Sequence, residues 1–139
     1  MFKYALLLAG LTQIAIAVSS LLIPRLLDWP AETRRLTNLT RHVFWTYAGY
    51  TFGIHLAFGI LSLSAPSALL ERTTLAAAVT GFIAVYWAVR VVLQFAIYDR
   101  SIAATKPLFQ AGEVLYATAF VFLALTNGAA ALYNAGVIG

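Results

Sequence analysis

Apolar residues run along this chain in four long stretches that are separated by short, more polar connections. The stretches cover about residues 4–24, 43–64, 74–98 and 111–132. Each is close to or above the roughly 20 residues that a helix needs to cross a bilayer. The pattern predicts an all-α, integral membrane four-helix bundle, arranged up-down-up-down, in which residues 1–139 form a single transmembrane domain.

Composition agrees with this membrane prediction. Hydrophobic residues make up 62% of the chain and charged residues only 10%, a balance that soluble domains rarely have. The absence of cysteine excludes disulfides, thiolate metal sites and cysteine nucleophiles. The net charge is +4, but the basic residues lie at the ends of the apolar stretches, where they orient a membrane protein. We therefore expect the lipid bilayer and other membrane chains as partners, and no nucleic acid.

The positive charges are unequally divided between the two sides of the predicted bundle. The first and third connections carry six Lys and Arg residues, whereas the opposite side carries only Lys3 and Arg72. Because positive residues favour the cytoplasmic side, these two connections are expected in the cytoplasm. Both termini are then expected on the outer side of a cell membrane. This is the inner membrane if the protein is bacterial. The six residues are Arg25, Arg34, Arg35, Arg41, Arg100 and Lys106.

The first connection also predicts a short helix at the membrane surface. Pro30 stands where a helix can begin, and apolar residues recur after it at helical spacing. The arginines of this segment would face anionic head groups or a soluble partner. The apolar positions are Leu36, Leu39 and Val43, and the basic surface consists of Arg34, Arg35 and Arg41.

Small residues predict close packing between the helices. Gly49, Gly53 and Ala57 recur every four residues in the second stretch and form a face that another backbone can approach closely. This face can pack within the chain or against a neighbouring subunit, and the sequence leaves both open. Weaker pairs of the same kind are Ala77 with Gly81, Ala84 with Ala88, and Ala124 with Gly128.

Several polar residues fall inside the apolar stretches, where each needs a partner or water. Arg90 lies eight residues before Tyr98, roughly 12 Å from the end of the third stretch, which is too deep for easy snorkelling. We expect an ion pair between Arg90 and Glu113, with Gln94 as a hydrogen-bonding neighbour. Tyr86 extends the same helical stripe. The full set within the stretches is Gln13, His55, Tyr86, Arg90, Gln94, Glu113 and Asn127.

His55 lies near the middle of the second stretch, at a depth similar to that of Gln13. A neutral His55 hydrogen-bonded to another helix, with Gln13 as a candidate partner, is the expected arrangement, and haem or metal ligation by His55 is the alternative. A haem with two histidine ligands would require a second buried histidine. Since His42 lies at the membrane edge on a different helical face, only dimerisation could supply one.

Known catalytic patterns are missing from the sequence. Glu113 is the only acidic residue within a stretch, whereas carboxylate-bridged di-iron bundles need about four acidic ligands. No catalytic residue and no metal site is therefore predicted.

Three functional hypotheses remain open. The first is a non-catalytic subunit or scaffold of a larger membrane protein complex. The second is a small oligomeric transporter or channel for an anionic solute, with a path formed by Tyr86, Arg90, Gln94 and Glu113. The third is a membrane enzyme or carrier that binds haem, quinone or lipid in a pocket near His55, Tyr47, Trp87 and Gln94.

Overall fold

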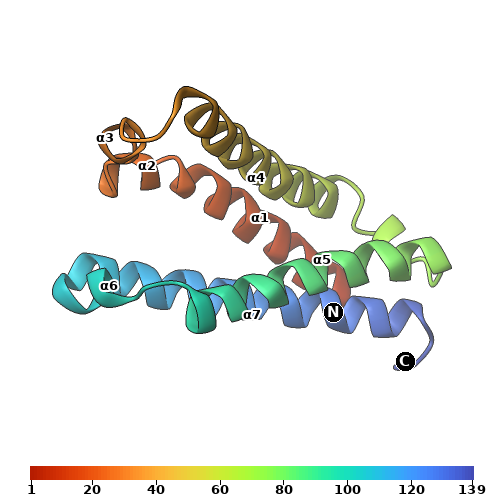
Figure 1. Ribbon diagram of the computed structural model, residues 1–139. Helices are drawn as coiled ribbons and strands as arrows, with labels where there is room; N and C mark the ends of the chain where they lie inside the picture. Colours follow the sequence, from red (N-terminus) through yellow and green to blue (C-terminus); the bar gives the residue numbers. More distant parts are fainter.

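The computed structural model describes the backbone of residues 1–139 and the side chains of residues 1–101 and 104–139. The described chain is all-helical and contains no β-strand, as the sequence predicts. A 3-10 helix (Ala68–Leu70) precedes α5, and a π-helix (Leu93–Ile97) extends it. The α-helices are α1 (Phe2–Ser20), α2 (Ile23–Leu26), α3 (Trp29–Thr33), α4 (Asn38–Ser64), α5 (Thr74–Val92), α6 (Ser101–Thr105) and α7 (Pro107–Asn134) (Figure 1).

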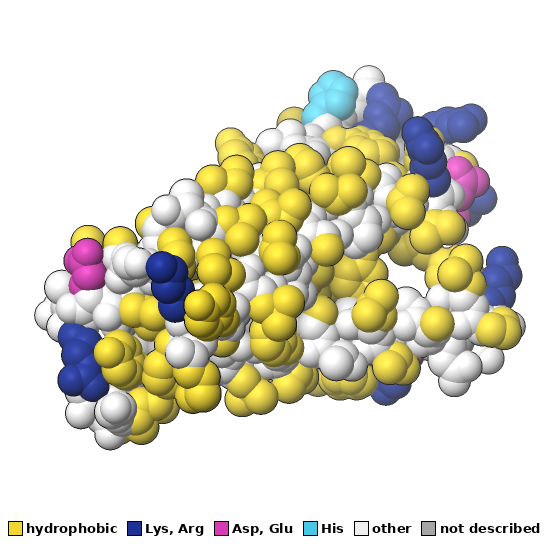
Figure 2. Space-filling model, turned by 180° about the vertical axis from the view of Figure 1, so that it is seen from behind, with side chains coloured by type: hydrophobic (Ala, Val, Ile, Leu, Met, Phe, Trp, Pro, Cys, Tyr) yellow, Lys and Arg dark blue, Asp and Glu magenta, His cyan; other side chains and the backbone are white. Residues whose placement is uncertain are grey.

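Three helical segments of the described chain are long and apolar enough to cross a membrane. They are Phe2–Leu26, Thr74–Ile97 and Pro107–Asn134. These segments correspond to the first, third and fourth predicted spans, although the last begins at Pro107 and not near Ala111. Figure 2 shows apolar side chains over most of one face of the molecule, with lysine and arginine gathered mainly toward its two ends. These features fit a multi-pass membrane protein.

The second predicted span lies within α4, which differs from the other long helices. Its 27 residues extend about 40 Å, more than the roughly 30 Å of a bilayer core. However, α4 is not among the segments that are apolar enough by composition, because tyrosine, threonine and glycine residues accompany His55 in its interior. Composition therefore supports three spans, and the four-helix membrane bundle remains a prediction.

The long helices form two pairs. Helix α1 packs along α4, and α5 packs along α7. The two pairs meet near the chain termini and diverge toward α2 and α6, so that the molecule resembles a wedge (Figure 1). Viewed from behind, the surface is hollowed between the two lobes at the diverging end (Figure 2).

Glycine brings α1 and α4 into close contact. A Cβ atom added at Gly10 would lie 2.8 Å from Cγ of Leu63, and one added at Gly59 would lie 2.6 Å from Cδ1 of Ile14. Each added atom would also lie 3.1 Å from the carbonyl oxygen of the other glycine. This pair of facing glycines, and not the predicted face of Gly49 and Gly53, is where the two backbones meet.

Small residues also lie in the contact between α5 and α7. A Cβ atom at Gly81 would lie 3.8 Å from Cβ of Ala131, and one at Gly128 would lie 3.9 Å from Cβ of Ala84. These are ordinary van der Waals distances. Gly81, Ala84 and Gly128 therefore lie in the interface between α5 and α7, where an added methyl group would still fit.

The chain termini and the connection between α4 and α5 lie together at the closed end of the wedge. The side chain of Asn134 donates to the carbonyl oxygen of Leu69 at 2.8 Å and accepts from the backbone N–H of Arg72 at 3.3 Å. The guanidinium of Arg72 lies 4.4 Å above the Tyr133 ring, which also packs against Phe2. These contacts hold the end of α7 against the connection.

The segment between α1 and α4 departs from the prediction. A short helix does begin beside Pro30, but α3 ends at Thr33, so the predicted continuation through Leu36 and Leu39 is wrong. The reason is the cap at Thr37, whose side chain accepts a hydrogen bond from the N–H of Thr40 and starts α4 well before the apolar stretch. Trp29 instead packs edge-to-face on Phe44 and Trp45, so that these rings join α3 to the start of α4.

Candidate functional site

A cluster of polar side chains lies where the two helix pairs cross. The central polar cluster, as we call it, joins α1, α4 and α5. Trp87, Gln13 and Ser62 are fully buried, and His55 is only 3% exposed. Its members are Gln13, His55, Ser62, Tyr86 and Trp87.

Trp87 is the centre of this cluster. Its indole Nε1–H donates to Oε1 of Gln13 at 3.0 Å, and Nε2 of Gln13 donates to Oγ of Ser62 at 3.3 Å. On its faces, the indole stacks on His55 at 4.9 Å and on Phe120 of α7 at 5.3 Å between ring centroids. Through Trp87, all four long helices therefore share one core.

His55 has a different partner from the one predicted. Its Nε2 lies 2.8 Å from the hydroxyl of Tyr86, whereas Trp87 stands between His55 and Gln13. The predicted bond between His55 and Gln13 is therefore wrong, because the large indole fills the space between α1 and α4 at this depth. The Nδ1 atom of His55 is buried and has no hydrogen-bond partner among the described residues.

Arg90 and Glu113 do not form the predicted ion pair. Nη1 of Arg90 donates to the hydroxyl of Tyr98 at 3.2 Å, and its guanidinium lies 5.3 Å from the Phe120 ring centre. Glu113 pairs with Arg100 instead. The reason is the path of the chain after α5, which turns back through α6 and brings Arg100 closer to the start of α7 than Arg90.

The π-helix contributes to this path. The N–H of Tyr98 donates to the carbonyl oxygen of Leu93, five residues earlier, at 2.9 Å. Each such bond winds the chain more widely than an α-helix, which changes the direction of the side chains that follow. Tyr98 is thereby placed over Arg90, and Gln94 turns toward the gap between the helix pairs.

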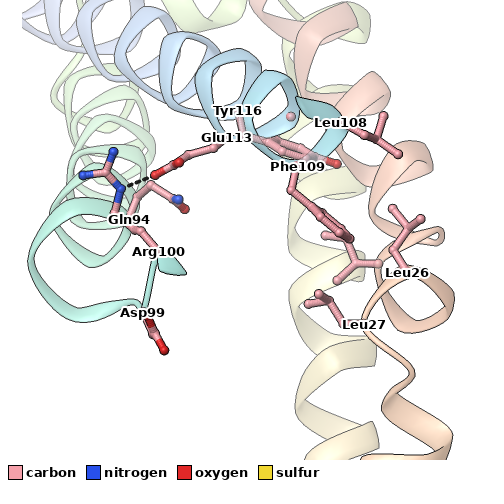
Figure 3. Close-up of a pocket in the computed structure, with 11 residues that line it drawn as sticks. Leu26, Leu27, Gln94, Asp99, Arg100, Leu108, Phe109, Glu113 and Tyr116 are labelled. Atoms are coloured by element: carbon pink, nitrogen blue, oxygen red, sulfur yellow. Dashed lines mark hydrogen bonds and ion pairs between the residues drawn. The ribbon is translucent and has the colours of Figure 1, made fainter. Parts of the chain in front are cut away.

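A cavity of about 310 Å³ lies at the open end of the wedge. Figure 3 shows Leu26 and Leu27 on one side, Phe109 and Leu108 of α7 facing them, and the pair of Arg100 and Glu113 at the far wall. Most of the wall is apolar, and the polar groups gather on one part of it. The lining residues are Ile23, Leu26, Leu27, Gln94, Asp99, Arg100, Leu108, Phe109, Gly112, Glu113 and Tyr116.

Asp99 is ionised at the edge of this cavity. The backbone N–H of Ser101 donates to its carboxylate at 2.9 Å. This bond, and to a smaller extent the hydroxyl of Ser101, holds the pKa of Asp99 below its usual value of 3.8. A full negative charge is therefore present at neutral pH.

The predicted glycine face of α4 is uncovered. No atom of the described residues lies within 4 Å of a Cβ atom added at Gly49 or Gly53, and both residues are exposed together with Ala57. At 100° per residue, this face points nearly opposite to His55, Gly59 and Ser62, the buried side of α4.

The predicted basic surface lies at the N-terminal end of α4 and in the segment just before it. Arg34 and Arg35 are exposed, and Arg41 is half-buried with Nη2 donating to the side chain of Asn38 at 2.8 Å. Arg34 donates from Nε to the carbonyl oxygen of Pro30 at 3.3 Å. These arginines lie apart from both the central polar cluster and the cavity.

The predicted residues thus separate into three places. Tyr86, His55 and Gln13 belong to the central polar cluster, Gln94 and Glu113 line the cavity, and Arg90 lies between them. The described residues contain no group of three or more histidine, cysteine or acidic side chains that could hold a metal ion. Of the four residues predicted to form a path for anions, Gln94 and Glu113 line this cavity, and Tyr86 and Arg90 are not among its lining residues.

Sequence reasoning missed three residues that shape the site. Arg100 was assigned only to the basic connection, and Gly10 and Gly59 were not singled out. Gly10 is the single glycine of α1, and Gly59 does not continue the four-residue spacing of Gly49, Gly53 and Ala57, so no local spacing marks the two glycines. Their importance arises only from the way α1 and α4 are placed side by side.

Comparison with models of known protein families, with curated proteins and with solved structures finds no match. The class of protein therefore follows from the fold itself. The chain is all-helical, with three helices able to cross a membrane and a polar cluster buried among its long helices.

Proposed function

We propose that the chain is a structural, non-catalytic subunit of a membrane assembly, joined to a second copy of itself through the uncovered face of α4. In this proposal α4 also crosses the membrane, as the second of four spans in an up-down-up-down bundle. Both termini lie outside, and the arginine-rich end faces the cytoplasm of a cell whose inner membrane holds the protein.

One observation carries this proposal, the outer face of α4. Apart from the adjacent Gly49 and Tyr50, its residues follow one another at intervals of three and four, all of them are exposed, and none carries a charge. Small residues form the middle of this face, so that another helix can approach closely, and larger side chains flank them. The outer face consists of Thr46, Gly49, Tyr50, Gly53, Ala57 and Ile60.

The low apolarity of α4 supports a protein neighbour on this face. Threonine, tyrosine and glycine gain little from contact with lipid tails, but their hydroxyl and backbone groups can hydrogen-bond across a helix interface. A second copy is the simplest neighbour, because a two-fold axis places the same face on both chains. An uncharged face can meet itself without electrostatic repulsion.

The buried polar groups support a structural role for the rest of the chain. Tyr86 partners His55, Trp87 partners Gln13, and Arg100 partners Glu113, all within one chain. Pairing of this kind is how a membrane interior tolerates polar side chains. The bonds of Tyr86 to His55 and of Trp87 to Gln13 tie the two helix pairs together, and the pair of Arg100 and Glu113 holds the segment after α5 against α7.

The mass of the purified protein tests the proposal. In mild detergent, native mass spectrometry is expected to find a particle of two 15.1 kDa chains. Gly53→Leu is expected to give single chains, because leucine keeps the two helices apart. The control is Gly112→Leu, which lies on α7 and also has no described atom within 4 Å of the added Cβ.

The control is expected to remain a pair. Circular dichroism of each variant establishes that it has folded. A wild-type particle of one chain would contradict the proposal, as would a Gly53→Leu variant that remains paired.

A further inference from the structure

The cavity at the open end of the wedge has the two-part character of an amphiphile site. One part of its wall is formed by Leu26 and Leu27 on one side and by Leu108 and Phe109 of α7 on the other. The other part carries Gln94 and the pair of Arg100 and Glu113, while the carboxylate of Asp99 at its edge points away from that pair (Figure 3). An apolar chain fits the first part, and a polar head group fits the second.

The position of the cavity suits a ligand that comes from the membrane. It lies beside the ends of two segments that are apolar enough to cross a bilayer, Phe2–Leu26 and Thr74–Ile97. This depth is the boundary between the hydrocarbon core and the head groups. A lipid at this boundary keeps its head at the interface while one of its chains enters the gap between the helix pairs.

The charges of the cavity select the kind of head group. Glu113 provides a carboxylate and Arg100 a guanidinium at the cavity, so its polar part offers a head group one partner of each sign, and Lys106 lies beside it with Nζ 5.5 Å from the ring centre of Phe109. The bond to Glu113 uses Nε of Arg100, and the side chain of Arg100 is 49% exposed. A guanidinium has five N–H donors, so its terminal nitrogens can also bind a phosphate.

We propose that this cavity binds one zwitterionic phospholipid whose head group carries a primary ammonium. The phosphate lies on Arg100, and the ammonium donates hydrogen bonds to the carboxylate of Glu113. A quaternary ammonium has no N–H to donate, and a glycerol head group has no positive charge. Phosphatidylethanolamine therefore fits the wall better than phosphatidylcholine or phosphatidylglycerol.

Gly112 provides a variant that blocks the cavity without disturbing the protein. It lines the cavity, and no described atom lies within 4 Å of a Cβ atom added to it. The side chain of Gly112→Leu therefore occupies space that the lipid would use. Since glycine is a poor helix former, the substitution does not weaken α7.

The experiment supplies purified protein with equal amounts of the three lipids, all with the same acyl chains, and counts the lipids retained per chain by native mass spectrometry. The wild type is expected to retain one phosphatidylethanolamine and about tenfold less of the other two. Gly112→Leu is expected to lose this lipid about tenfold, whereas the matched variant Gly53→Leu on α4 retains it.

Two results would overturn the proposal. One is equal retention of the three lipids by the wild type, and the other is retention by Gly112→Leu at the wild-type level. Pairing of chains is read from the same spectra as mass. Loss of pairing in Gly53→Leu with the lipid still bound therefore separates this inference from the proposed assembly.

Discussion

Gly59→Ala is expected to destabilise the protein, because Gly59 lies where α1 and α4 approach most closely. The added methyl group would lie 2.6 Å from Cδ1 and 2.8 Å from Cγ1 of Ile14, and 3.1 Å from the carbonyl oxygen of Gly10. Ile14 can turn its end away, but the carbonyl belongs to the backbone of α1, so the helices must move apart. Overpacking of this kind costs about 1–3 kcal/mol.

Gly112→Ala is the matched variant for this prediction. Gly112 also lies inside a long helix, α7, and no described atom lies within 4 Å of its added Cβ. Both substitutions gain about 1 kcal/mol from helix propensity, and this gain cancels when the two are compared. The free energy of unfolding should therefore be about 1–3 kcal/mol lower for Gly59→Ala than for Gly112→Ala.

The assay is reversible unfolding in mixed micelles of mild detergent and dodecyl sulfate, followed by tryptophan fluorescence. Trp87 lies in the core between the helix pairs, so its emission reports their separation. Unfolding free energies that agree within about 0.5 kcal/mol would refute the close contact of α1 with α4.

Two further predictions concern the central polar cluster and the edge of the cavity. Trp87→Phe removes the N–H that donates to Gln13. Since Trp87 is also the fluorescent reporter, unfolding of this variant in the same micelles is followed by circular dichroism, and a loss of about 1–3 kcal/mol is expected. Trp45→Phe near the surface should change stability by less than about 0.5 kcal/mol, and equal effects would contradict the buried bond. Because the folded-state pKa of Asp99 is lowered, its bond to the N–H of Ser101 is fully present above pH 3.8 and is lost as the pH falls further. The amide proton signal of Ser101 in an NMR titration should therefore shift with a midpoint below 3.8, and a midpoint at or above this value would contradict the prediction.

The existence of the long helices could be predicted from the sequence, because long apolar runs leave few alternatives in a membrane protein. Their ends were harder to predict. Thr37 starts α4 within a polar segment, and the apolar run from Val43 gives no sign of this cap. Local hydrogen bonds, and not hydropathy, determine where this helix begins.

The polar residues of the site were found, but their partners were not. Hydropathy and spacing show that His55 and Gln13 lie at similar depth, yet they do not show that the indole of Trp87 lies between them. Likewise, Arg90 and Glu113 were matched by depth alone, whereas the π-helix and α6 bring Arg100 to Glu113. Contacts between helices depend on rotation and on the path of the connections, which residue spacing along one helix does not encode.

Pairing of two chains through α4 can be measured most directly with single cysteines in native membranes, because the natural chain has none. Gly53→Cys places a thiol in the middle of the outer face, and Gly112→Cys serves as the control on α7. A disulfide requires Cα atoms about 4.4–6.8 Å apart, a distance that only closely packed helices reach. With a mild oxidant, Gly53→Cys is expected to form disulfide-linked dimers while Gly112→Cys forms no disulfide-linked dimer, and the absence of linked dimers above the level of that control would contradict the proposed assembly.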